Sequence, residues 1–125
     1  MTDRYAVFGN PLSHTLSPRI HTAFAEQFGE DMRYEAIQAP VDGFEATVRA
    51  FIAAGGKGIN VTVPFKVQAE AMADESLEAA NICGAANCLQ FSDGRIVADN
   101  FDGIGLVRDI EDNLGVELKG KRVLF

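Results

Sequence analysis

The chain has 125 residues and a mass of 13.5 kDa, which is the size of one ordinary domain. Hydrophobic residues make up 47% and charged residues 23%, a composition typical of a globular protein and not of a disordered one. The net charge of −7 excludes a general attraction to nucleic acid or anionic membranes, so we expect neither as a partner. No apolar run reaches the ~20 residues of a membrane span. The two cysteines, Cys83 and Cys88, are typical of reduced thiols, and we expect a cytoplasmic protein.

Strands and helices are predicted to alternate along the chain. Apolar or β-branched runs bounded by glycine, proline or polar residues predict strands at 5–8, 33–39 and 58–63. A hairpin is predicted over 86–98, because Ser92-Asp93-Gly94-Arg95 separates two short apolar runs. The alternation predicts an α/β fold with a mainly parallel mixed sheet, one antiparallel strand, and helices on both faces.

The predicted helices have start and stop signals. Ser17 followed by Pro18 predicts an N-cap, and Gly29 predicts the end of that helix. Asp42 and Glu45 predict a capping box for the next helix. Shorter helices are expected over 65–72, from 76, and from 102 to 114. The expected buried stripes are Ile20, Ala23, Phe24 and Phe28 in the first helix, Phe44, Val48, Phe51 and Ile52 in the second, and Ile104, Val107, Ile110 and Leu114 in the last.

The end of the sequence predicts a further strand. Residues 121–125 (Lys-Arg-Val-Leu-Phe) are typical of the opening of a buried strand, and the sequence stops inside it. We therefore expect one domain over residues 1–118, with residues 119–125 as the first strand of another.

Hydroxyl side chains gather where the first strand meets the first helix. Thr15 and Ser17 lie at a predicted helix N-terminus, whose free N–H groups favour anions, and they could bind a carboxylate. The alternative is that Ser17 is only an N-cap and Thr15 only a turn residue. His14 and His21 would need further ligands at suitable spacing to hold a metal, so we expect no metal site.

Polar side chains also interrupt the third predicted strand and follow it. Asn60 and Thr62 face the same side, because side chains in a strand repeat every two residues. Lys66 follows at the carboxyl end of the strand, where open α/β sheets bind ligands, and is a candidate acid, base or ammonium donor. Its alternative is a solvated helix lysine.

Two further polar residues follow or adjoin strands. Asp102 is either the N-cap of the last helix or a carboxylate beside Lys66. Asn87 either structures a turn or contacts the ligand.

Taken together and in this order, the segments resemble the shikimate dehydrogenase family. The resemblance covers the family's substrate-binding domain and rests on Gly9-Asn10-Pro11, His14-Thr15-Leu16-Ser17-Pro18, Asn60-Val61-Thr62-Val63-Pro64-Phe65-Lys66, Gly84-Ala85-Ala86-Asn87 and Asn100-Phe101-Asp102-Gly103. It implies NADPH-dependent, reversible reduction of 3-dehydroshikimate to shikimate in aromatic amino-acid (chorismate) biosynthesis. It also implies that residues 119–125 begin a nicotinamide-binding Rossmann domain, so NADP would bind mainly beyond residue 125, and residues 1–125 alone would be inactive.

The resemblance assigns roles to individual residues. Lys66 and Asp102 would form the catalytic pair, and shikimate or 3-dehydroshikimate would be the ligand. Thr15 and Ser17 would hold its carboxylate, while Asn60, Thr62, Asn87 and Asp102 would bind ring hydroxyls. Three positions depart from the family pattern: Thr15 replaces a serine, and Cys88 and Phe101 each replace a threonine.

Those departures leave the fine substrate preference open. The alternatives are a dual-specificity quinate/shikimate dehydrogenase and a non-catalytic module that binds ligands of this type. The sequence does not determine the oligomeric state, and a homodimer is one alternative.

Overall fold

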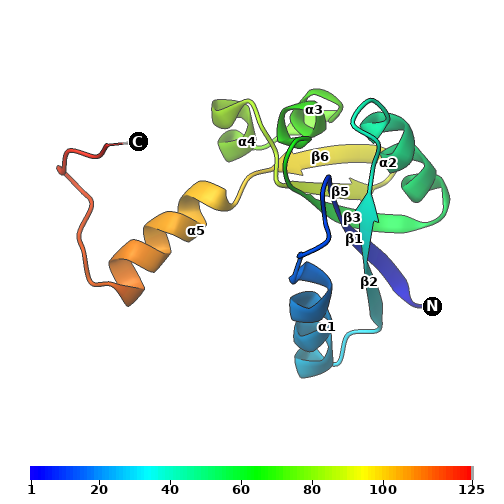
Figure 1. The fold of residues 1–125 in the computed structure, drawn as a ribbon, viewed down its shortest axis with the longest axis horizontal. Helices are drawn as coiled ribbons and strands as arrows, with labels where there is room; N and C mark the ends of the chain where they lie inside the picture. Colours follow the sequence, from blue (N-terminus) through cyan, green and yellow to red (C-terminus); the bar gives the residue numbers. More distant parts are fainter. Residues whose placement is uncertain (125) are drawn as a thin grey trace.

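A computed structural model describes residues 1–124 of the chain (Figure 1). The alternation of strands and helices predicted from the sequence is confirmed. The strands are β1 (Asp3–Gly9), β2 (Met32–Gln38), β3 (Gly56–Val61), β4 (Glu75–Ser76), β5 (Cys88–Ser92) and β6 (Arg95–Asp99). The helices are α1 (Ser17–Phe28), α2 (Phe44–Ala53), α3 (Lys66–Ala71), α4 (Glu78–Cys83) and α5 (Asp102–Arg108), and α5 continues into a π-helical turn, η1 (Asp109–Asn113).

The strands form one mixed sheet in the order β2-β1-β3-β5-β6-β4. β1 is parallel to both β2 and β3, and β4 is parallel to β6. Only β5, among the described strands, runs antiparallel to its neighbours, β3 and β6. Because β5 and β6 form the predicted hairpin, with Asp93 and Gly94 at positive φ in its turn, the chain reverses there and the sheet gains its single antiparallel strand. The predicted fold class is therefore confirmed.

The hydrophobic core lies on one face of the sheet, under α2, α3 and α4 (Figure 1). Phe8 in β1 packs edge-on against Phe44 and Phe51 of α2, and Phe44 stacks on Phe65 at 4.7 Å between ring centroids. The predicted stripe of α2 is confirmed, because Phe44, Val48 and Phe51 are buried and Ile52 is partly buried. The predicted Asp42 and Glu45 capping box is wrong, since α2 begins at Phe44 without a side-chain cap.

The other face of the sheet is covered by α1, which lies beside β1 and β2 (Figure 1). Helices therefore lie on both faces, but the predicted burial of the α1 stripe is wrong. Ile20, Phe24 and Phe28 are 45%, 52% and 72% exposed, and only Ala25 of this helix is buried. The apolar spacing correctly indicates an amphipathic helix, but its apolar side is turned away from the sheet and no described segment covers it.

The last helix extends away from the sheet toward the C-terminus (Figure 1). Its predicted buried stripe is also wrong, because Ile104, Val107 and Leu114 are exposed. Residues 121–124 have no regular secondary structure, and the strand predicted over 121–125 extends to Phe125, which lies outside the described residues. That strand and the division at residue 118 stay predictions. No helix within residues 1–124 is long and apolar enough to cross a membrane.

Candidate functional site

The strands β1, β3 and β6 have their carboxyl ends at one edge of the sheet, where the antiparallel β5 begins. The register places Val7, Asn60, Cys88 and Asp99 in one row across β1, β3, β5 and β6. Beyond this row the chain leaves the sheet at Gly9, Thr62 and Asn100, and it enters the sheet after Asn87. The topology thus brings polar segments that are distant in sequence to one edge, as predicted from the strand ends.

Lys66 and Asp102 meet at this edge. Lys66 is the first residue of α3, Asp102 is the first residue of α5, and Lys66 Nζ donates to Asp102 Oδ2 at 2.6 Å. The Lys66 side chain is 31% exposed and that of Asp102 is 53% exposed, so the pair is open to solvent on one side. Asp102 makes no capping hydrogen bond to α5, so its alternative role as an N-cap is not seen.

Asn87 completes a polar trio with this ion pair. Its Nδ2 donates to Asp102 Oδ1 at 3.0 Å, while its Oδ1 accepts from the backbone N–H of Phe101 at 3.0 Å. The two carboxylate oxygens of Asp102 therefore face different donors, an ammonium and an amide. Asn87 therefore structures the turn and also contacts a candidate catalytic residue, while its contact with the ligand stays a prediction.

Asn100 holds this arrangement from beneath and was not predicted as a site residue. It is 8% exposed, and its Oδ1 accepts from the backbone N–H of Asp102 at 3.0 Å. Its Nδ2 donates to the carbonyl of Ala85 at 3.0 Å, which ties the loop after β6 to the loop before β5. Asn100 lies directly after a predicted strand and within the motif Asn100-Phe101-Asp102-Gly103, but in sequence it cannot be told from a turn residue.

Asn60 and Thr62 lie at the end of β3 and just beyond it. The neighbours Ile59 and Val61 are buried in the core, so strand alternation turns Asn60 and Thr62 to the opposite face, as predicted. A Cβ at Gly9 would clash with the Thr62 methyl group, which shows how closely that methyl lies to the end of β1. The backbone N–H of Asn10 donates to the Val63 carbonyl at 3.0 Å and joins these two strand ends.

Thr15 and Ser17 lie on the segment between β1 and α1. The predicted N-cap at Ser17 is wrong: α1 begins at Ser17 itself, and Leu16 occupies the cap position without a side-chain hydrogen bond. Instead, Thr15 Oγ1 accepts from the backbone N–H of Ser17 at 3.3 Å. Because the Thr15 oxygen accepts this bond, the Thr15 hydroxyl proton is left to donate elsewhere.

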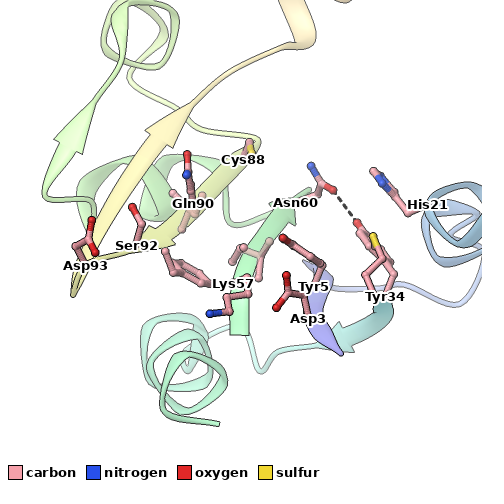
Figure 2. Close-up of a pocket in the computed structure, with 15 residues that line it drawn as sticks. Asp3, Tyr5, His21, Tyr34, Lys57, Asn60, Cys88, Gln90, Ser92 and Asp93 are labelled. Atoms are coloured by element: carbon pink, nitrogen blue, oxygen red, sulfur yellow. Dashed lines mark hydrogen bonds between the residues drawn. The ribbon is translucent and has the colours of Figure 1, made fainter. Parts of the chain in front are cut away.

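An open pocket of about 770 Å³ lies on the sheet face beside α1 (Figure 2). Of the seven predicted site residues, only Asn60 lines it; His21, Tyr34 and Cys88 are its neighbours at that end of the pocket. Burial, with a smaller contribution from Asp99, raises the pKa of the Cys88 thiol, so this side chain stays protonated and uncharged near neutral pH. Lys66, Asn87 and Asp102 do not line the pocket.

The structure connects the predicted residues in two groups. Hydrogen bonds join Lys66, Asn87 and Asp102 directly. Asn60 accepts a hydrogen bond from Tyr34, and the Ser17 side chain opposes the rise in the Tyr34 pKa, so Ser17 lies near Tyr34. The combined set of hydrogen-bonding groups is one ammonium, one carboxylate, amides and hydroxyls. This set suits a small anionic molecule that carries several hydroxyl groups. Within residues 1–124, no three histidine, cysteine or acidic side chains cluster as metal ligands.

Comparison with known proteins places the sequence in one family. Residues 7–89 match the family described as the shikimate dehydrogenase substrate binding domain. Shikimate dehydrogenase (NADP(+)) of Cupriavidus taiwanensis is 57% identical over 98% of the chain, and that of Alkalilimnicola ehrlichii is 55% identical over 99%. The chain spans 42% and 46% of the lengths of these two relatives.

Solved structures show the same fold. An Ael1 enzyme from Pseudomonas putida matches 97% of the chain with a TM-score of 0.91 and 54% identity, and the chain covers 45% of it. Shikimate 5-dehydrogenase from Thermus thermophilus, solved in complex with shikimate, matches 96% of the chain with a TM-score of 0.87 and 32% identity, and 46% of that structure is covered.

Proposed function

The chain belongs to the family of shikimate dehydrogenase substrate-binding domains, and from this premise we propose that it is the substrate-binding part of an NADP-dependent shikimate dehydrogenase. The reaction is the reversible reduction of 3-dehydroshikimate to shikimate, a step toward chorismate and the aromatic amino acids. We place the protein in the cytoplasm, where this biosynthesis occurs. The ligand of residues 1–124 is the six-membered ring with its carboxylate and hydroxyl groups.

The observation that carries this proposal is the trio of Lys66, Asp102 and Asn87. An ammonium 2.6 Å from a carboxylate that also accepts from an amide is a preorganised polar constellation at the ligand-binding edge of an α/β sheet. The surrounding loops fix its members, because the Ala86 N–H donates to the Lys66 carbonyl and the Asp102 N–H donates to the Asn100 side chain. Such a trio can hold a ring hydroxyl or ketone without rearranging.

Lys66 supplies the charge that this chemistry needs. When bound, NADPH would supply a hydride for the ketone carbon, and negative charge would then develop on the ketone oxygen. The Lys66 ammonium beside that oxygen stabilises the charge and donates the proton that turns it into a hydroxyl. Asp102 orients the ammonium through its Oδ2 atom and accepts a hydrogen bond from a ring hydroxyl. In the reverse direction Lys66 accepts the proton from the hydroxyl of shikimate.

The remaining hydroxyl and amide residues bind the rest of the ligand. Thr15 and Ser17 donate their hydroxyl protons to the carboxylate at the start of α1, and Asn60, Thr62 and Asn87 bind ring hydroxyls. The extra methyl of Thr15 narrows the carboxylate pocket relative to a serine. It therefore favours shikimate over quinate, the larger of these two related acids. Phe101, which is 52% exposed next to Asp102, adds an apolar wall at the ring.

The donor set at this edge does not fit the cofactor. NADP carries several phosphate charges, whereas Lys66 is the cation of the described cluster and is already paired with Asp102. We therefore place the nicotinamide-binding Rossmann domain, and with it the phosphate-binding loop, beyond residue 125. This chain positions the substrate, and the dinucleotide is held elsewhere.

The test is turnover in the longer protein that we propose this chain begins. Lys66→Met removes the charge and keeps the length, and turnover should fall about a hundred-fold or more with little change in KM. Lys57→Met is the matched control, because Lys57 is exposed and lies away from the trio, and it should keep wild-type turnover. Asp102→Asn should lose both turnover and affinity, and the double variant should lose far less than the sum.

Two results would contradict the proposal. If Lys66→Met keeps turnover within a few-fold of wild type, Lys66 is an ordinary solvated lysine and not a catalytic residue. A wild-type protein that binds shikimate but never oxidises it with NADP would support the non-catalytic module instead.

A further inference from the structure

Asn60 is held by a residue that the proposed reaction does not assign. The phenolic Oη of Tyr34 in β2 donates to Asn60 Oδ1 in β3 at 2.7 Å, across the intervening strand β1 (Figure 2). Tyr34 is 9% exposed, so this bond is largely shielded from water. An asparagine carboxamide has an accepting oxygen and a donating NH₂ group. A hydrogen bond to the oxygen fixes the oxygen toward its partner, so the NH₂ group faces away from that partner.

The ring of Tyr34 is itself clamped. The imidazole of His21, from α1, stacks flat on it with 4.3 Å between centroids and 3° between planes. Burial raises the pKa of the phenol far above its usual value, the nearby Cys88 adds to this rise, and a hydrogen bond from Ser17 opposes it. The phenol therefore stays protonated throughout the neutral pH range and always has a proton to donate.

We propose that Tyr34 is a positioning residue that holds the Asn60 carboxamide in one orientation, with its NH₂ group turned away from Tyr34 and toward the ligand. Figure 2 shows the nitrogen of Asn60 pointing away from the Tyr34 hydroxyl. The site then offers a donor at Asn60 and selects a ligand oxygen that accepts there. This inference rests on the proposed function only for the identity of that ligand, a hydroxyl of shikimate or 3-dehydroshikimate.

The binding test compares five forms of the chain, wild type and four variants, with shikimate as the probe, measured by calorimetry. Tyr34→Phe removes only the hydroxyl and should weaken binding about five- to ten-fold, the scale of one hydrogen bond. Asn60→Ala should weaken it at least as much, and the double variant should bind like Asn60→Ala alone, because Tyr34 acts through Asn60. Tyr5→Phe is the control: the Tyr5 ring lies against Gly58 in the same pocket and should bind like wild type.

A second test needs no ligand. In the ¹⁵N spectrum of the side-chain amides, Tyr34→Phe should shift the Asn60 NH₂ signals and lower their order parameter, while Tyr5→Phe should leave them unchanged. If the Tyr34→Phe variant does not fold, a measurement on the wild-type protein tests the positioning role instead. A slowly exchanging Tyr34 hydroxyl proton with a nuclear Overhauser contact to the Asn60 side chain supports the inference.

The outcomes separate this inference from the proposed function. Wild type that does not bind shikimate, with an Asn60 amide that responds to Tyr34→Phe, would defeat the proposed ligand and leave the positioning role standing. Fully additive losses in the double variant, an Asn60 amide that ignores the loss of the phenol, or a fast-exchanging Tyr34 hydroxyl without the contact would each overturn the positioning role.

Discussion

The hydrogen atom that Gly9 carries in place of a side chain lets the end of β1 approach Thr62. A Cβ at this position would clash with the Thr62 methyl group, would lie 2.8 Å from Leu12 Cδ2, and would lie 3.3 Å from the Val63 carbonyl oxygen. The last of these contacts is backbone and cannot rotate away. The glycine therefore sets the spacing between two segments that carry proposed ligand contacts.

Gly9→Ala should destabilise the fold and disturb the ligand site together. We expect a loss of about 1–3 kcal/mol in the free energy of unfolding, the cost of an overpacked site, measured with urea. Gly105→Ala is the matched control, because a Cβ there meets no atom within 4 Å, and in the interior of α5 it should stabilise by up to about 1 kcal/mol. A Gly9→Ala protein with wild-type stability and wild-type shikimate binding would show that the close approach has no role.

His21 gives the fold a pH dependence below pH 6.5. Burial against Tyr34 lowers the pKa of His21 below its usual value of 6.5. Between the lowered native pKa and 6.5 the unfolded chain binds more protons than the native one. The contribution of the neutral imidazole is therefore complete above pH 6.5 and is lost as the pH falls through the native pKa.

His21→Phe keeps a flat ring against Tyr34 and removes the titration, so its free energy of unfolding should vary less with pH across that interval. The imidazole signal in a proton NMR titration checks the cause directly. A midpoint at or above 6.5 would contradict the burial argument.

At the scale of elements, α1 and α2 have similar apolar spacing but different surroundings. Phe44 in α2 is 1% exposed and packs between Phe8 and Phe65, whereas Phe28 in α1 is 72% exposed. Phe44→Ala should cost about 3–5 kcal/mol in urea unfolding, the range for a buried phenylalanine. Phe28→Ala should stay within about 0.5 kcal/mol of wild type, as for an exposed position. Equal losses at the two positions would mean that the α1 face is covered in solution.

The same pair of helices shows what periodicity can predict. Spacing identifies the amphipathic face of a helix, and for α2 that face is the buried one because the sheet lies under it. In α1 and α5 the spacing is equally clear, yet it does not tell whether another segment covers the face. β4 was missed because two residues are too few to produce an alternation. The longer strands, the mixed sheet and the hairpin were predictable, since each depends on short sequence patterns such as apolar runs and turn residues.

The site was predictable in part for a similar reason. Lys66, Asn87 and Asp102 each follow or precede a strand, and strand ends in a parallel sheet converge on one edge. Tyr34 and Asn100 were missed because their roles arise from contacts across strands and loops, 26 residues apart for Tyr34 and Asn60. In sequence Tyr34 is indistinguishable from an ordinary buried strand residue.

At the scale of the whole molecule, one edge of an acidic domain concentrates the groups that suit a small anion with hydroxyls. The net charge of −7 supplies no general attraction to an anion, so the binding that we propose would depend on placed donors such as Lys66, Thr15 and Ser17. Because we place the nicotinamide domain beyond residue 125, residues 1–125 alone should bind the ligand and show no NADPH oxidation with 3-dehydroshikimate.

The most direct measurement is a ¹⁵N NMR titration of this chain with shikimate, with cyclohexene-1-carboxylate, which lacks the three hydroxyls, as the control ligand. We expect saturable shifts from shikimate, confined to Thr15, Ser17, Asn60, Thr62, Lys66, Asn87 and Asp102 and their neighbours. The control ligand should shift only the signals around Thr15 and Ser17, and more weakly. Shifts that are absent, that are the same for both ligands, or that centre on Lys57 and Asp93 at the far end of the pocket would contradict the proposed ligand site.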